Sequence, residues 1–96
     1  MLLEHDKLIG LPVQTQSKQA LGKLDGLVFE IESQSIFQYI VRPAGITHIF
    51  DKELLINREQ IISITDKKII VEDAVYKSIQ EEQKTKTQLQ TEGAIK

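Results

Sequence analysis

The chain has 96 residues, with 12 Lys and Arg against 14 Asp and Glu, a formal net charge of −2 and no cysteine. This length allows one domain with an extension, and the lack of cysteine excludes disulfides, thiolate nucleophiles and cysteine-based metal sites. The charge balance gives no general attraction to nucleic acid or anionic lipid, so neither is the expected partner.

Hydropathy and composition divide the chain into three parts. Residues 1–8 form a short lead-in, residues 9–72 a β-rich domain, and residues 73–96 a helix followed by a polar tail. No apolar run approaches the ~20 residues that span a bilayer, and the first residues lack the pattern of a signal peptide. We therefore expect a cytoplasmic protein without direct membrane insertion.

The longest strand is expected at residues 21–32, after a short first strand at 13–15 and a polar turn. Its apolar residues occupy even positions, such as Leu24, and odd positions, such as Phe29. A flat strand has a period of two and cannot bury both sets on one face. Gly26 lies where the parity changes and predicts a bulge or sharp bend, which curls a sheet into a small barrel.

The next strand, at residues 35–42, is apolar on both faces. Simple alternation places Phe37 and Tyr39 in the core and Ile36 and Ile40 on the opposite face, where a protein partner, a second copy or the tail helix could cover them. Ile36 and Ile40, together with the apolar Phe50 further along the chain, are therefore the candidate partner surface.

A short strand is expected at residues 47–50, followed by another at 54–56. Asn57 and Gln60 then have the spacing of a capping box and predict one helical turn between two strands.

Residues 61–64 and 69–71 predict a second hairpin, with Ile62 and Ile64 on one face. Asp73 is a candidate N-cap for a helix from residue 74, anchored by apolar residues at helical spacing. These anchors are Val75, Tyr76 and Ile79.

Candidate catalytic and metal-binding residues are few. The histidines, His5 and His48, lack the spacing of a metal site, and Asp51 and Glu53 are read as parts of a solvated turn. The serines lack a nucleophile-elbow context, and the glycines lack the spacing of a phosphate-binding loop. We therefore expect no catalytic residues, no metal and no cofactor.

The order of turns and strands resembles the PRC-barrel family over about residues 9–72. The segments that carry the resemblance are turn glycines and apolar strands at residues 10–13, 21–24, 28–30, 39–41, 54–56, 58–64 and 69–71. This small barrel occurs in the cytoplasmic part of the photosynthetic reaction-centre H subunit, in a ribosome maturation factor and in short stand-alone proteins. The resemblance implies an all-β fold, a small and strongly bent antiparallel β-barrel, here with a C-terminal helical extension.

The resemblance carries no catalytic residues to this chain and implies an adaptor that binds a protein partner or forms a homodimer. An alternative is an assembly factor associated with ribosomes or RNA processing. A second alternative, a small-ligand carrier or enzyme, would need a cavity lined by convergent polar groups, whereas a barrel of this size is usually filled by its own side chains.

Overall fold

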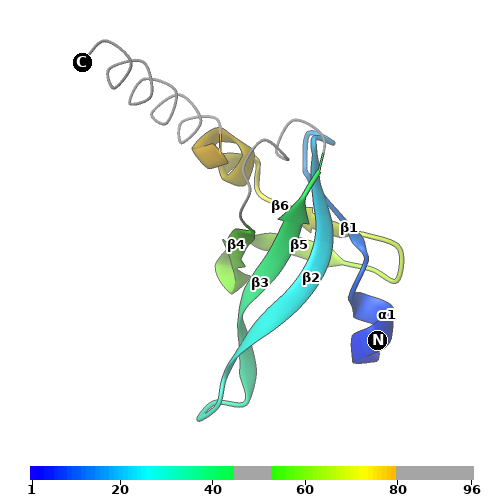
Figure 1. The fold of residues 1–96 in the computed structure, drawn as a ribbon, viewed down its shortest axis with the longest axis vertical. Helices are drawn as coiled ribbons and strands as arrows, with labels where there is room; N and C mark the ends of the chain where they lie inside the picture. Colours follow the sequence, from blue (N-terminus) through cyan, green and yellow to red (C-terminus); the bar gives the residue numbers. More distant parts are fainter. Residues whose placement is uncertain (45–52, 80–96) are drawn as a thin grey trace, which may run out of the picture.

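The computed structural model describes residues 1–44 and 53–79, and the strands in these residues form one six-stranded sheet (Figure 1). The order of strands across the sheet is β4-β3-β2-β1-β6-β5. The elements are α1 (His5–Leu8), β1 (Pro12–Thr15), β2 (Ala20–Glu30), β3 (Ser35–Pro43), β4 (Leu54–Asn57), the 3-10 helix η2 (Arg58–Gln60), β5 (Ile61–Ile64) and β6 (Ile69–Val71). The expected strand at 47–50, which includes His48 and Phe50, lies outside the described residues, as does Asp51.

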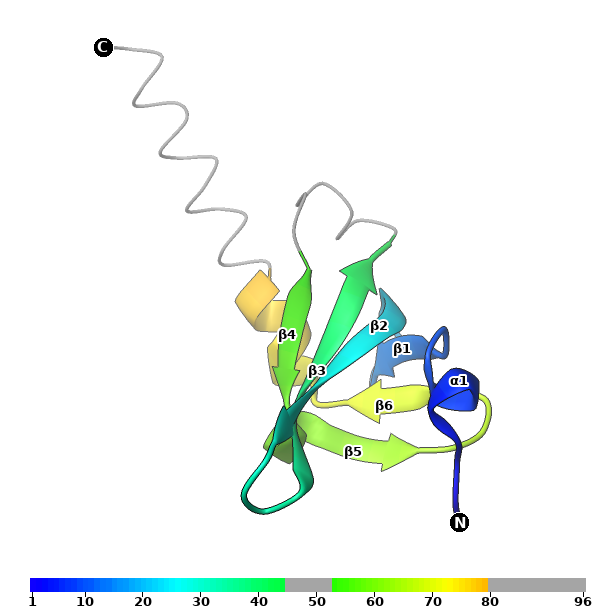
Figure 2. The same cartoon turned by 60° about the horizontal axis from the view of Figure 1, so that its bottom comes forward.

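The sheet is strongly bent, as expected, but it is neither fully antiparallel nor closed by strand pairing in the described residues. Strands β2, β3 and β4 lie side by side along roughly the same axis, with antiparallel neighbours, and β5 and β6 cross below them (Figure 2). Strands β1 and β6 pair in parallel, and all other neighbours are antiparallel. The predicted antiparallel barrel is therefore wrong in these two respects. The sheet of described strands stays open because η2 leads the chain from edge strand β4 to edge strand β5 without pairing the two strands.

The bend in β2 arises at the predicted glycine. The β2–β3 register shifts between Leu24 and Gly26, so Asp25 is the extra residue of a β-bulge. Strands β2 and β3 also approach each other closely at Gly22. Its φ is +149°, and a Cβ atom at this position would collide with the backbone carbonyl of Arg42. Only glycine combines that backbone conformation with that proximity. The bulge at Asp25 therefore bends β2, and Gly22 lets β2 lie close against β3.

Two further bulges overturn predictions that relied on simple alternation. A register shift places Phe29 opposite Ile36 and leaves Phe37 unpaired, so Ile36 packs against the core while Phe37 is exposed. The prediction that Ile36 lies on the face opposite Tyr39 is therefore wrong. A similar shift in β5 exposes Ile62 while Ile64 packs inward, so these two residues do not share a face. In both strands the extra residue resets the two-residue period.

The core is apolar and draws residues from strands β1, β2, β3, β4 and β6 and from the helical residues 73–79. Its fully buried members include Leu21, Leu24, Val41, Ile56 and Ile69. Leu3 and Leu8 of the lead-in pack against it, as does Ile9, and Val75 and Ile79 belong to it. No helix in the described residues has the length and hydrophobicity needed to cross a bilayer.

The capping box between Asn57 and Gln60 is confirmed, since the Gln60 side chain accepts a hydrogen bond from the backbone N–H of Asn57 at 3.0 Å. Asp73, by contrast, is the first helical residue rather than the residue before the helix. Its carboxylate bonds to Ser17 in the β1–β2 turn, which ties the helix to the sheet.

Candidate functional site

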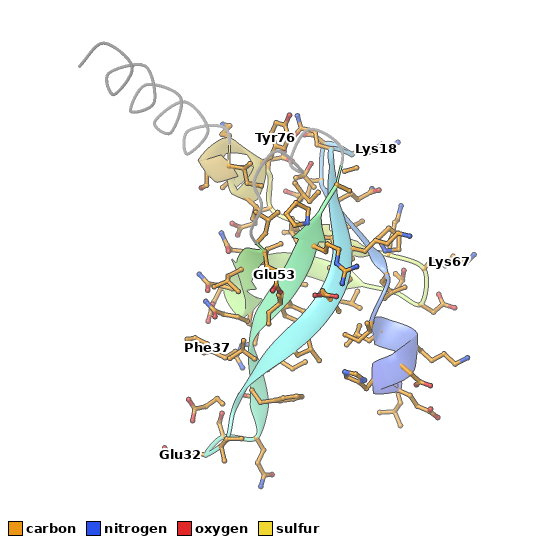
Figure 3. The ribbon with its side chains drawn as sticks, viewed as in Figure 1. Lys18, Glu32, Phe37, Glu53, Lys67 and Tyr76 are labelled. Carbon is orange, nitrogen blue, oxygen red and sulfur yellow. The ribbon has the colours of Figure 1, made fainter. Side chains whose placement is uncertain are left out.

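The β2–β3 hairpin projects beyond the rest of the sheet, and Glu32 lies at its tip (Figure 3). The four residues 31–34 join the strands, with Gln34 in the left-handed region at φ 56°. The Gln34 N–H donates to the Ile31 carbonyl at 3.3 Å, and the hydroxyls of Ser33 and Ser35 lie 2.7 Å apart. These contacts hold the turn at the end of a long pair of strands.

The hairpin projects because its strands are longer than their neighbours. Strand β1 pairs with β2 only as far as Lys23, and β4 pairs with β3 only from Gln38 to Val41. Between residues 28 and 37 the two hairpin strands therefore have each other as their only strand neighbours in the described part of the chain. Apolar side chains in this segment are therefore largely uncovered, except Ile36, which packs against the core.

Three large apolar side chains are exposed there. Phe29 is 54% exposed, Ile31 79% and Phe37 55%, and we call this set the hairpin patch. Phe37 points away from the hairpin (Figure 3), because it is the extra residue of the bulge. Single exposed apolar side chains are common on protein surfaces, but aromatic residues gathered at one projecting end are typical of contact surfaces.

The charged residues of this segment are both acidic. Glu30 and Glu32 are exposed, and Glu30 pairs across the hairpin with Ser35. The Oε1 atom of Glu30 accepts a hydrogen bond from the backbone N–H of Glu32 at 3.2 Å. This bond directs the Glu30 carboxylate to the turn, beside the hairpin patch.

The structure does not bring the predicted partner residues Ile36 and Ile40 together on one face of the sheet. Ile40 does not join the core and pairs with Leu55, which is 59% exposed, across β3 and β4. Ile36 packs against the core. Phe50 lies outside the described residues. Ile40 therefore remains a candidate for partner contact on the outer face of the sheet, at a distance along the strand from the hairpin patch.

Sequence reasoning missed Phe29, Ile31 and Phe37 as surface residues. Strict alternation assigned Phe37 to the core, and the period alone gave no sign of the second bulge. A usable signal was present in strand length, because residues 21–32 and 35–42 were both expected to be longer than any strand available to flank them. The overhanging ends of such a hairpin must be exposed.

A shallow depression of about 310 Å³ lies on another part of the sheet. It is lined by Ile9, Gly10, Lys23, Leu24, Asp25, Arg42, Pro43 and Ala44. At its edge, Arg42 donates to Asp25 at 2.8 Å, so the two charges neutralise each other. No convergent set of catalytic groups faces this depression from the described residues, and it is a weaker candidate site than the hairpin.

Titratable groups elsewhere show no catalytic arrangement in the residues described. Burial raises the pKa of the Tyr39 hydroxyl, and the nearby Arg58 partly opposes this change. His5 is exposed on α1, Glu53 is exposed before β4, and no three metal-ligating side chains converge in residues 1–44 and 53–79.

Comparison with known proteins agrees with this fold. The sequence matches the PRC-barrel domain family over residues 2–75. The solved structure of a 16S ribosomal RNA processing protein, RimM, from Pseudomonas aeruginosa is 24% identical, with a TM-score of 0.54, over 73% of this chain and 43% of that chain. The likeness at this identity concerns the fold, and the chain spans less than half the length of that protein. No curated protein matches the chain.

Proposed function

Because the chain belongs to the PRC-barrel domain family, we propose that it is a non-catalytic docking module that binds a protein partner through the hairpin patch. The observation that carries this proposal is the exposure of Phe29, Ile31 and Phe37 on a projecting hairpin. Large apolar side chains of this kind supply most of the energy of many protein interfaces when a partner covers them. The family brings no catalytic motif to this chain.

The second candidate function is docking on a ribosomal particle. The fold likeness to a 16S ribosomal RNA processing protein supports this candidate more directly than it supports an unrelated adaptor role. On this view the chain is an assembly factor, and its partner is a protein of the particle. Self-association as a homodimer is a further alternative.

The test compares the tagged 96-residue chain with the double variant Phe29→Ser, Phe37→Ser. Both are used to capture partners from lysate with and without RNase, and both are sedimented with ribosomal particles through sucrose gradients. We expect the wild type to capture a defined protein or particle. The double variant should capture at least about 10-fold less of that partner. Circular dichroism should show that both proteins are folded.

The matched control is Leu55→Ser, which removes another exposed apolar side chain from the outer face of β4. Equal capture by wild type and the hairpin variant would overturn the proposal. A selective loss in Leu55→Ser would move the docking surface to the face that includes Ile40. Sedimentation equilibrium on the wild type would detect a homodimer.

A further inference from the structure

The projecting end of the hairpin carries acidic residues and no basic residue. Glu30 and Glu32 are the charged residues between Gly26 and Val41, and no Lys, Arg or His occurs in that segment. The whole chain has 12 basic and 14 acidic residues, so the remainder is formally neutral. The segment between Gly26 and Val41 therefore has a formal charge of −2.

The charge and the apolar surface lie in the same place. Glu30 directly follows Phe29, and Glu32 directly follows Ile31. The bond from the Glu32 N–H holds the Glu30 carboxylate at the turn, so both acidic residues lie at the same projecting end as the hairpin patch. Residues 29–34 are all exposed, so a partner that encloses this end of the hairpin meets both the apolar side chains and the carboxylates.

We infer that the partner presents a basic segment, in which Lys or Arg residues flank a short apolar stretch. This inference rests on the proposed docking function and adds the chemistry of the partner to it. Opposite charges at an interface rim increase the association rate and exclude wrong partners. The apolar part of the segment covers the hairpin patch, while its cations face Glu30 and Glu32.

The same charges disfavour the other possible occupants. RNA and anionic membranes would place phosphates against the two carboxylates, and no basic residue between Gly26 and Val41 would offset them. A symmetric contact between two copies would bring the Glu30 and Glu32 residues of both chains together, because a two-fold interface uses the same patch on each side.

The test is a selection of random peptides of about 12 residues displayed on phage. The 96-residue chain is the bait, and the double variant Phe29→Ser, Phe37→Ser is used for counter-selection. We expect the retained peptides to be enriched in Lys and Arg relative to the input library. Their binding to Glu30→Gln, Glu32→Gln should be weaker by about 3- to 10-fold than to wild type. Added salt should weaken wild-type binding and change the Gln variant less.

Three results would overturn the inference. Retained peptides of neutral or acidic composition, with unchanged affinity for the Gln variant, would leave the docking function standing and refute the basic partner. A library with no peptide that discriminates wild type from the Phe variant would refute the docking function itself. Binding of a fluorescent oligouridine by wild type but not by the Phe variant would show that the patch binds RNA instead.

Discussion

The carboxylate of Asp73 accepts two hydrogen bonds from Ser17, one from the backbone N–H at 2.9 Å and one from the hydroxyl at 2.8 Å. The residues are 56 positions apart, and the contact joins the helical residues 73–79 to the β1–β2 turn. Val75 and Ile79 of the same helical segment are buried in the core. A polar contact therefore aligns the helix at its first residue, and apolar contacts hold the rest.

The Ser17–Asp73 contact should make stability depend on acid pH. The hydrogen bonds from the Ser17 hydroxyl and N–H lower the pKa of Asp73, with a smaller contribution from Thr15. Folding therefore favours the carboxylate. Its contribution is complete above the unfolded-state pKa of about 3.9 and is lost as the pH falls through the lower folded-state pKa. We expect Asp73→Asn to flatten the acid limb of stability against pH, measured by urea unfolding.

The control for this experiment is Asp66→Asn, which removes the same charge from the exposed loop between β5 and β6. Ser17→Ala should reproduce part of the Asp73→Asn effect, because it removes the hydroxyl and keeps the N–H. Identical acid limbs for wild type and Asp73→Asn would contradict the assigned role.

Gly22→Ala should destabilise the fold by at least about 2–3 kcal/mol. Its φ of +149° is unfavourable for alanine, and the added Cβ would collide with the Arg42 carbonyl in β3. The matched control is Gly26→Ala in the same strand, whose Cβ would lie 3.4 Å from Cδ1 of the Ile40 side chain, at the edge of ordinary contact. We expect that control to change the free energy of unfolding by less than about 1 kcal/mol. Equal losses for both variants in urea unfolding would refute the argument.

The bulge in β5 predicts unequal roles for two neighbouring isoleucines. Ile64 packs against the core, whereas Ile62 is 48% exposed. Ile64→Ala should therefore lower the free energy of unfolding by about 1–3 kcal/mol, and Ile62→Ala by less than about 1 kcal/mol. Thermal and urea unfolding of both variants would measure the difference, and equal losses would place the two side chains on one face after all.

The Asp25–Arg42 pair should contribute little to stability despite its 2.8 Å distance. The side chains are 35% and 74% exposed, respectively, so water and salt screen the attraction. A double-mutant cycle with Asp25→Asn and Arg42→Gln should give a coupling energy below about 1 kcal/mol that decreases further with added salt. A larger coupling that is insensitive to salt would show that this pair stabilises the bulge.

Local sequence signals predicted the elements well because they depend on neighbouring residues. The parity change around Gly26 indicated the bulge in β2, and the Asn57–Gln60 spacing indicated the turn before β5. The bulges at Phe37 and Ile62 contain no glycine, and no nearby sequence feature predicts them. Strict alternation consequently failed at Ile36, which packs inward, and at Ile62, which does not.

The sequence by itself determined the family, the mostly β composition and the balance of charge, since each is a property of residue order and type. Only the tertiary structure decided that β1 pairs in parallel with β6, that Asp73 binds Ser17, and that Phe29 and Phe37 are exposed. These outcomes depend on which strands become neighbours in the sheet and on the positions at which each strand ends. An overhanging hairpin leaves its own apolar residues uncovered, and no local pattern encodes how far its neighbours extend.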